Sequence, residues 1–88
     1  MKNVNIGNIL KNMRNLNTKY TQKDMGEKLS LYDTTISSYE RGNSQPDFQT
    51  ILNYAEICDF EIKIINKKTG QESSIEELSK DYKKYNTL

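Results

Sequence analysis

Residues 21–42 decide the fold, and they read Thr-Gln-Lys-Asp-Met-Gly-Glu-Lys-Leu-Ser-Leu-Tyr-Asp-Thr-Thr-Ile-Ser-Ser-Tyr-Glu-Arg-Gly. The pattern predicts two short helices separated by a break at residues 30–32, which is a helix-turn-helix. The hydroxyl of Thr21 can cap the first helix, and Asp24 follows at the spacing of a capping-box acid. Gly42 is expected to end the second helix.

Packing explains the special positions in this stretch. Gly26 is expected where the two helices cross, because only a very small side chain lets the backbones approach. Ile36 and Tyr39 are expected to point inward. The residues that must then point outward are Thr34, Thr35, Ser37 and Ser38. Short hydroxyl side chains bury little area, but they suit contact with phosphates and base edges in a major groove about 12 Å wide.

Helical spacing continues on both sides of residues 21–42. Before them, one apolar helix face with Asn5 as its cap is formed by Ile6, Ile9, Leu10, Met13 and Leu16. After the loop that contains Pro46, Asp47 is expected to cap another helix. The inward positions of that helix are Ile51, Leu52, Ala55 and Cys58. The sequence therefore predicts a small all-α domain around one core.

The hydrophobic period changes from 3.6 to 2 over residues 60–65, which indicates a strand. A lone strand leaves its backbone donors and acceptors unpaired, so it needs a partner. That partner is either a hairpin across Lys68-Thr69-Gly70 or the same strand of a second chain. From Ser74 the pattern predicts an amphipathic tail helix, with one side formed by Ile75, Leu78, Tyr82 and Tyr85. This helix is expected on the domain, on a dimer mate or free in solvent.

The composition excludes several classes of function. The chain has 88 residues, no histidine and one cysteine, Cys58, so no internal disulfide or cysteine metal cluster is expected. Without histidine, the commonest general base and the commonest neutral metal ligand are missing, so we expect no enzyme, no cofactor and no metal site. No run approaches the roughly 18 apolar residues of a membrane span, which favours a cytoplasmic protein.

The charge is distributed unevenly along the chain. Residues 1–45 hold seven Lys and Arg against four Asp and Glu, a net charge of +3. Residues 46–62 hold four Asp and Glu and no Lys or Arg. The first half is therefore suited to face a polyanion, and the second half is not.

The motif also resembles a known family. Residues 34–42, preceded by Thr21-Gln22 and followed by Pro46, are similar to the lambda-repressor-like helix-turn-helix proteins of the Cro/repressor or XRE type. The resemblance extends over most of the first 60 residues. It implies a compact DNA-binding domain of four or five helices, usually dimeric on a two-fold operator.

The resemblance implies DNA-binding roles on both motif helices and on the loop that follows, at Gln22, Lys23, Asp33, Thr34, Thr35, Ser37, Ser38, Arg41 and Asn43. Gln22 matches a glutamine that usually binds a phosphate. Asp33, Thr34 and Ser38 match positions that usually face bases. Arg41 would contact phosphates, which position a protein on DNA without reading the sequence.

Arg14 and Glu40 match a pair that usually forms a structural ion pair. Three positions depart from the family pattern. Ser30 replaces the usual turn glycine and would need a left-handed backbone. Tyr32 replaces the usual small capping residue, which leaves Asp33 as the alternative cap. The base-facing set also lacks Arg, Gln and Asn, so the bidentate pairings with guanine and adenine are missing and weak or shape-based readout is expected.

We therefore expect an all-α fold of four to five helices with a short C-terminal β-strand and a tail helix. Residues 1–60 would form the DNA-binding domain, with the helix-turn-helix at about 21–41. Residues 61–88 would form a dimerisation extension. The expected dimer contacts are Phe60, Ile62 and Ile64.

The expected function is that of a dimeric, sequence-specific repressor of the phage, mobile-element or antitoxin type. Its expected partners are a double-stranded DNA operator and a second copy, with a cognate toxin or another protein as a further candidate and no membrane. The alternative is a protein-interaction module, such as an antitoxin or inhibitor, that keeps the fold and binds little DNA. The slope of affinity against salt concentration separates the two, because counterion release drives DNA binding.

Overall fold

Each of the first four helices has an apolar face, and three of them also begin at a capping side chain. The computed structural model describes residues 3–82, and its first four helices are α1 (Ile6–Asn17), α2 (Gln22–Leu29), α3 (Asp33–Glu40) and α4 (Phe48–Ile57). Side-chain oxygens of Asn5, Thr21 and Asp47 cap α1, α2 and α4. At α2, Thr21 and Asp24 each accept the other's backbone N–H, which completes the capping box. These predicted caps are confirmed.

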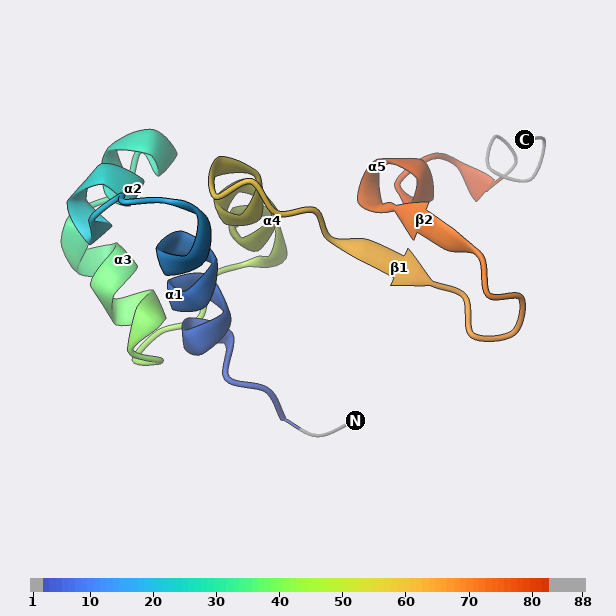
Figure 1. Cartoon of the computed structure of the whole chain (residues 1–88), viewed down its shortest axis with the longest axis horizontal. Coiled ribbons are helices and arrows are strands. Elements are labelled where there is room, and N and C mark those ends of the chain that lie inside the picture. The colour runs from blue at the N-terminus through green and yellow to red at the C-terminus, as the bar shows by residue number, and fades with distance from the viewer. Residues whose placement is uncertain (1–2, 83–88) are drawn as a thin grey trace.

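The four helices form a bundle at one end of the molecule (Figure 1), and each of them supplies part of the core. The buried apolar side chains are Leu10, Met13, Met25, Ile36, Tyr54, Ala55 and Cys58. Full burial of a large apolar side chain stabilises a fold by roughly 1.5–3 kcal/mol. Cys58 is a buried core residue, as expected, and burial raises the pKa of its thiol.

Two glycines mark the closest backbone approaches in the bundle. A Cβ on Gly7 would lie 2.6 Å from the carbonyl oxygen of Glu40, so α1 rests directly on the end of α3. A Cβ on Gly26 would lie 2.5 Å from the carbonyl oxygen of Leu31. The steric reason predicted for Gly26 therefore holds, but its nearest neighbour is the turn after α2 and not the body of the next helix.

The turn between α2 and α3 is tight. Ser30 ends α2 with a left-handed backbone at φ 58°, as its place in the motif predicted. The N-cap of α3 is Tyr32, whose side chain makes no capping hydrogen bond. The expectation that Asp33 caps α3 is wrong, because the extended residue is Tyr32 and Asp33 is already the first residue of the helix.

The apolar stripe predicted for α1 is only partly buried. Leu10 and Met13 lie in the core, whereas Ile9 is 43% exposed and Leu16 is 73% exposed. Helical spacing identifies the apolar side of a helix, but neighbouring elements decide which part of that side is covered. In α1 the neighbours cover the line through Gly7, Leu10 and Met13, and they leave the flanks open.

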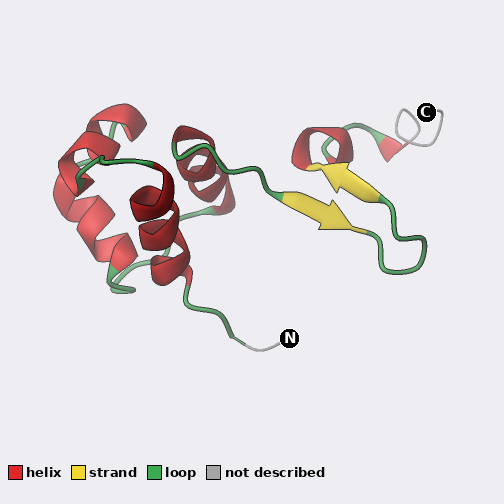
Figure 2. Cartoon of the chain, viewed as in Figure 1, coloured by secondary structure: helices red, strands yellow, loops and turns green. Residues whose placement is uncertain are grey.

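The chain beyond α4 forms a separate layer that we call the extension, residues 61–82 as far as the structure describes it. It consists of β1 (Lys63–Ile65), β2 (Glu72–Ser74) and α5 (Ile75–Leu78), and Figure 2 shows the two strands as a hairpin beside the bundle. The strands are antiparallel, with Ile64 opposite Ser73. Of the two partners left open for the strand, the hairpin is the one present within the chain.

The predicted strand over residues 60–65 is shorter than expected. Only residues 63–65 pair with β2, while Phe60 and Ile62 pack against the core of the bundle. The alternation of residues 60–62 therefore reflects contact with the bundle, and the strand begins only where a partner strand is available.

The predicted tail helix is also shorter within the described residues. Ser74 caps α5 by accepting the N–H of Glu77 at 3.1 Å, and the helix ends after Leu78. Tyr82 is exposed, and Tyr85 lies outside the described residues. Between residues 3 and 82, no helix has the length and apolarity needed to cross a membrane.

Candidate nucleic-acid interface

The outer side of α3 carries the predicted hydroxyl face. On its inner side Ile36 is fully buried, and Tyr39 is half-buried against the core. Thr34 is exposed, whereas Thr35, Ser37 and Ser38 are only half-buried. The hydroxyls predicted to point outward are thus reachable to different degrees, and Thr34 is the most open of them.

The loop after α3 folds back on the end of the helix. The Ser38 and Ser44 hydroxyl oxygens lie 2.9 Å apart, and the backbone N–H of Asn43 donates to the carbonyl oxygen of Ser38 at 2.9 Å. Arg41 and Asn43 remain exposed. This contact places a cation and an amide next to the outer face of α3.

The first turn of α2 lies beside the end of α3. Gln22 is half-buried, and its side-chain amide donates to Oε1 of Glu40 at 3.2 Å. Lys23 is exposed next to it. At the other end of α3, Asp33 is exposed and its Oδ1 accepts the N–H of Thr34 at 2.9 Å. The predicted DNA-binding residues therefore come from the start of α2, from α3 and from the loop after it.

Glu40 holds these elements together. Arg14 on α1 donates to both of its carboxylate oxygens, from Nη2 to Oε1 at 2.8 Å and from Nε to Oε2 at 2.9 Å. The predicted ion pair is confirmed and is bidentate. Burial by itself would raise the pKa of Glu40, but hydrogen bonds from Arg14, Tyr54 and Gln22 outweigh it and hold the pKa of this carboxyl below its usual value. The hydrogen bond to Glu40 raises the pKa of Arg14 in turn.

Tyr54 on α4 is the member of this network that sequence reasoning missed. Its hydroxyl donates to Oε2 of Glu40, and its ring is fully buried. Burial, and then the hydrogen bond to Glu40, raise the pKa of Tyr54, so the phenol stays protonated. A signal existed in the sequence, because Tyr54 is three residues after Ile51 and four before Cys58 and so shares their helix face.

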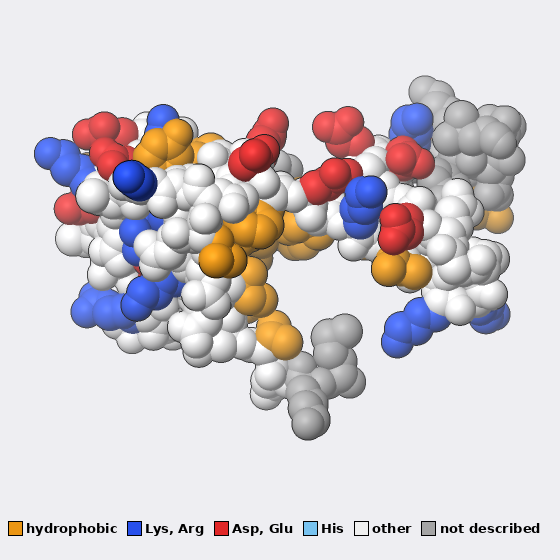
Figure 3. Space-filling view, in the orientation of Figure 1, with side chains coloured by type: hydrophobic (Ala, Val, Ile, Leu, Met, Phe, Trp, Pro, Cys, Tyr) orange, Lys and Arg blue, Asp and Glu red, His pale blue; other side chains and the backbone are white. Residues whose placement is uncertain are grey.

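Charges are separated over the surface. Figure 3 shows Lys and Arg side chains gathered near the C-terminal end of α3, and several acidic side chains along the stretch between the bundle and the hairpin. Within residues 3–82, no group of three or more His, Cys, Asp or Glu side chains is arranged to hold a metal ion. The exposed side chains on the α3 side are hydroxyl, amide and cationic groups, at Thr34, Asn43 and Arg41, together with the carboxylate of Asp33.

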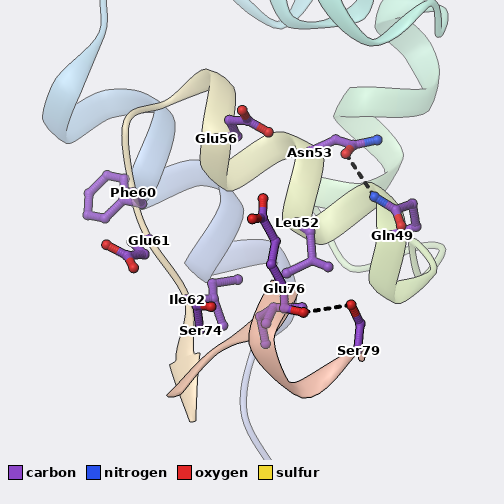
Figure 4. Close-up of a pocket in the computed structure, with 11 residues that line it drawn as sticks. Gln49, Leu52, Asn53, Glu56, Phe60, Glu61, Ile62, Ser74, Glu76 and Ser79 are labelled. Atoms are coloured by element: carbon purple, nitrogen blue, oxygen red, sulfur yellow. Dashed lines mark hydrogen bonds between the residues drawn. The ribbon is translucent and has the colours of Figure 1, made fainter. Parts of the chain in front are cut away.

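A second surface feature lies between α4 and the extension. It is a groove of about 510 Å³, which we call the acidic groove, and Figure 4 shows the residues that line it. Half-buried apolar side chains line part of it, namely Leu52, Phe60, Ile62 and Ile75. Exposed carboxylates line the rest, at Glu56, Glu61 and Glu76, and no Lys or Arg is among the lining residues. The predicted dimer residues Phe60 and Ile62 thus face this groove, while Ile64 is 46% exposed on β1.

Comparison with known proteins agrees with this geometry. A helix-turn-helix family model matches residues 10–65, which includes all of α2 and α3. The chain is 29% identical over 62 residues to the "Uncharacterized HTH-type transcriptional regulator YqaE" of Bacillus subtilis (strain 168), a match that covers 70% of this chain and 53% of the relative. The chain thus spans about half the length of that relative. No solved structure matches it. The chain belongs to the helix-turn-helix family, in its lambda-repressor-like, XRE/Cro type.

Proposed function

We propose that the chain is a sequence-specific DNA-binding transcription regulator that inserts α3 into the major groove. The observation that carries this proposal is the two-sided character of α3. Ile36 and Glu40 are buried on its inner side, and the outer side presents Thr34 with Arg41 and Asn43 exposed beyond it. In helix-turn-helix proteins the second helix reads base edges while the preceding helix contacts the backbone.

In this proposal the residues divide into two roles. Gln22, Lys23, Arg41 and Asn43 bind phosphates and set the orientation of the domain. Asp33, Thr34 and Ser38 face base edges, with Thr35 and Ser37 along the groove wall. Because no Arg, Gln or Asn is among the base-facing residues, DNA shape contributes much of the specificity.

We also propose that the regulator acts as a dimer in the cytoplasm, with residues 1–60 as the DNA-binding domain and the extension as the dimerisation element. β1 pairs with β2 along one edge, and no other strand within residues 3–82 pairs with its second edge, which could therefore take a second copy. A two-fold dimer would present two α3 helices to successive turns of the major groove. A small domain that occupies a promoter blocks access to it, so the proposed output is repression, of the phage, mobile-element or antitoxin type.

Selection from a random-sequence duplex pool tests the proposal. Fluorescence anisotropy then compares the selected duplex with a scrambled duplex of the same base composition. We expect the selected duplex to bind about a thousandfold more tightly, the lower end of the usual range, because bidentate contacts are missing. Equal affinity for the two duplexes would refute sequence-specific binding.

A second candidate function is the binding of a protein partner, such as a toxin. The acidic groove supports it, because an apolar floor rimmed by Glu56, Glu61 and Glu76 repels DNA but suits a basic, partly apolar protein segment. The two functions are compatible, since the groove and α3 are separate surfaces. If protein binding is the only function, affinity for duplex DNA will be weak and nearly independent of sequence.

A further inference from the structure

Tyr32 lies in the turn between α2 and α3, and its side chain does not pack against the core of the bundle. It occupies the N-cap of α3, where Ser, Thr, Asp or Asn would stabilise the helix, and it makes no capping hydrogen bond. Its side chain is 81% exposed, the most exposed large hydrophobic among the described residues. A residue that breaks a local rule without a compensating contact is a candidate for function.

Contacts with neighbouring residues fix the backbone of Tyr32, although its side chain is exposed. Its carbonyl oxygen accepts the N–H groups of Thr35 and Ile36 at 3.0 and 3.2 Å. A Cβ on Gly26 would lie 3.3 Å from the carbonyl carbon of Tyr32, so the turn sits directly on α2. Binding would therefore order only the torsions of the side chain, and an aromatic ring has few of them to lose.

The backbone of Tyr32 is extended, with φ −72° and ψ 150°, so the residue lies off the N-terminal end of α3 and not on its inner face. In a docked helix-turn-helix, this N-terminal end is the part of the second helix that contacts base edges. The ring of Tyr32 is thus carried to the same end of α3 as Asp33 and Thr34.

The charge at the N-terminal end of α3 indicates which part of the DNA Tyr32 would contact. Residues 32–34 include the carboxylate of Asp33 and no Lys or Arg, so attraction to phosphate does not favour this turn. The apolar group that a base edge presents in the major groove is the 5-methyl group of thymine. Apolar contact with an aromatic ring reads this methyl group without any hydrogen bond.

We propose that Tyr32 is a specificity-determining residue whose ring packs on a thymine methyl group in the major groove. This proposal rests on the proposed function and deepens it. It supplies an apolar base contact to an interface that lacks the bidentate side chains, and it explains why a helix-capping residue is absent from this position.

Two variants distinguish the contribution of the Tyr32 ring to DNA binding from that of its hydroxyl and from effects on the stability of the fold. Tyr32→Phe keeps the ring, and Tyr32→Ser removes it while restoring a capping side chain. We expect Tyr32→Phe to bind the selected duplex within about twofold of the unchanged protein, and Tyr32→Ser to bind about fourfold more weakly per subunit. We also expect Tyr32→Ser to raise the melting temperature, because it gains a cap. A purely structural role would instead shift affinity and stability in the same direction.

Replacement of thymines by uracils, one at a time, in the selected duplex completes the test. Uracil lacks only the 5-methyl group. We expect one position in each half-site where uracil weakens binding by the unchanged protein and by Tyr32→Phe but has no effect on Tyr32→Ser. The proposal is overturned if every uracil penalty persists in Tyr32→Ser, or if Tyr32→Phe loses as much affinity as Tyr32→Ser. Failure of the proposed function looks different, because then the unchanged protein would prefer no duplex at all.

Discussion

The hydroxyl of Tyr54 on α4 donates a hydrogen bond to the carboxylate of Glu40 on α3. Arg14 on α1 forms a salt bridge with the same carboxylate. Gln22 at the start of α2 donates to it as well. One buried carboxylate therefore joins all four helices of the bundle, and it projects from the inner side of α3, the helix proposed to read DNA. The orientation of α3 depends on this network as well as on the apolar core.

Removing the Tyr54 hydroxyl tests the network at small steric cost. We expect Tyr54→Phe to lower the free energy of unfolding by about 1–3 kcal/mol, because a buried hydrogen bond to a charged group is lost. Urea denaturation followed by circular dichroism measures this. The matched control is Tyr82→Phe, on an exposed ring, which should change stability by less than about 0.5 kcal/mol. Equal effects of the two variants would mean that the Tyr54–Glu40 bond contributes nothing.

The low pKa of Glu40 predicts how stability depends on pH. A carboxyl whose pKa is lower in the folded than in the unfolded state stabilises the fold above its unfolded pKa, which is about 4.3 for Glu. That contribution is lost as the pH falls through the folded-state pKa. We therefore expect the free energy of unfolding to be constant from about pH 7 to pH 6 and to decrease below about pH 5.

Hydrogen bonds at Asp24 and Asp47 also lower the pKa of those carboxyls, so part of this decrease is theirs. Glu40→Gln isolates the contribution of Glu40, because Gln keeps the shape and cannot titrate. Urea melts of both proteins at pH 7 and pH 3 should show a stability difference that is large at pH 7 and smaller at pH 3. A difference of the same size at both pH values would contradict the role assigned to the Glu40 carboxylate.

The hydroxyl face of α3 predicts a loss of binding without a loss of folding. We expect Thr34→Ala with Ser38→Ala to weaken binding to the selected duplex by about tenfold or more, which corresponds to ~1.4 kcal/mol. Stability should change little, because Thr34 is exposed and, among the described residues, the hydroxyl of Ser38 has only the loop hydroxyl of Ser44 as a partner. Ser44→Ala is the control, since it breaks the same hydroxyl pair but leaves the hydroxyls of Thr34 and Ser38 in place. If Ser44→Ala weakens binding equally, Ser38 acts through the loop and not on DNA.

The proposed dimer contact along β1 can be tested on either side of the strand. Ile64 and Ile65 are adjacent and both exposed, and successive residues of a strand point to opposite faces. We expect Ile64→Lys to shift sedimentation toward the monomer and Ile65→Lys to leave the mass unchanged. Ile62→Lys is a weaker test, since Ile62 packs on the core and its loss affects folding as well. A full dimer mass for Ile64→Lys would reject this interface.

The bundle could be predicted from the sequence because its determinants are local. Caps at Asn5, Thr21 and Asp47 act within a single turn of helix, so their residue types and spacing are sufficient. The left-handed backbone of Ser30 followed from its place in the motif. The Arg14–Glu40 pair joins residues far apart in sequence, and only the resemblance to the family indicated it.

Apart from the N-cap of α3, which is a local feature, the features that sequence reasoning missed are set by long-range contacts. Leu16 is exposed because no neighbouring element of the described chain covers it. The hydrophobic period of α1 cannot predict which of its apolar residues the neighbouring elements cover. Phe60 and Ile62 follow the strand pattern but face the bundle, because β2 is too short to pair with them. The role of Tyr54 does not follow from the sequence, because a tyrosine on an apolar helix face indicates only packing, and its hydrogen bond to Glu40 depends on the fold.

The salt dependence of DNA binding tests the central claim most directly. If Lys23 and Arg41 of both subunits neutralise phosphates, the slope of log K against log salt concentration should be about −3 or steeper for the dimer. Arg41→Gln should make that slope shallower by about 1 per subunit and weaken binding to all sequences alike. A slope near zero, or one that Arg41→Gln leaves unchanged, would contradict the docking of α3 and its loop on duplex DNA.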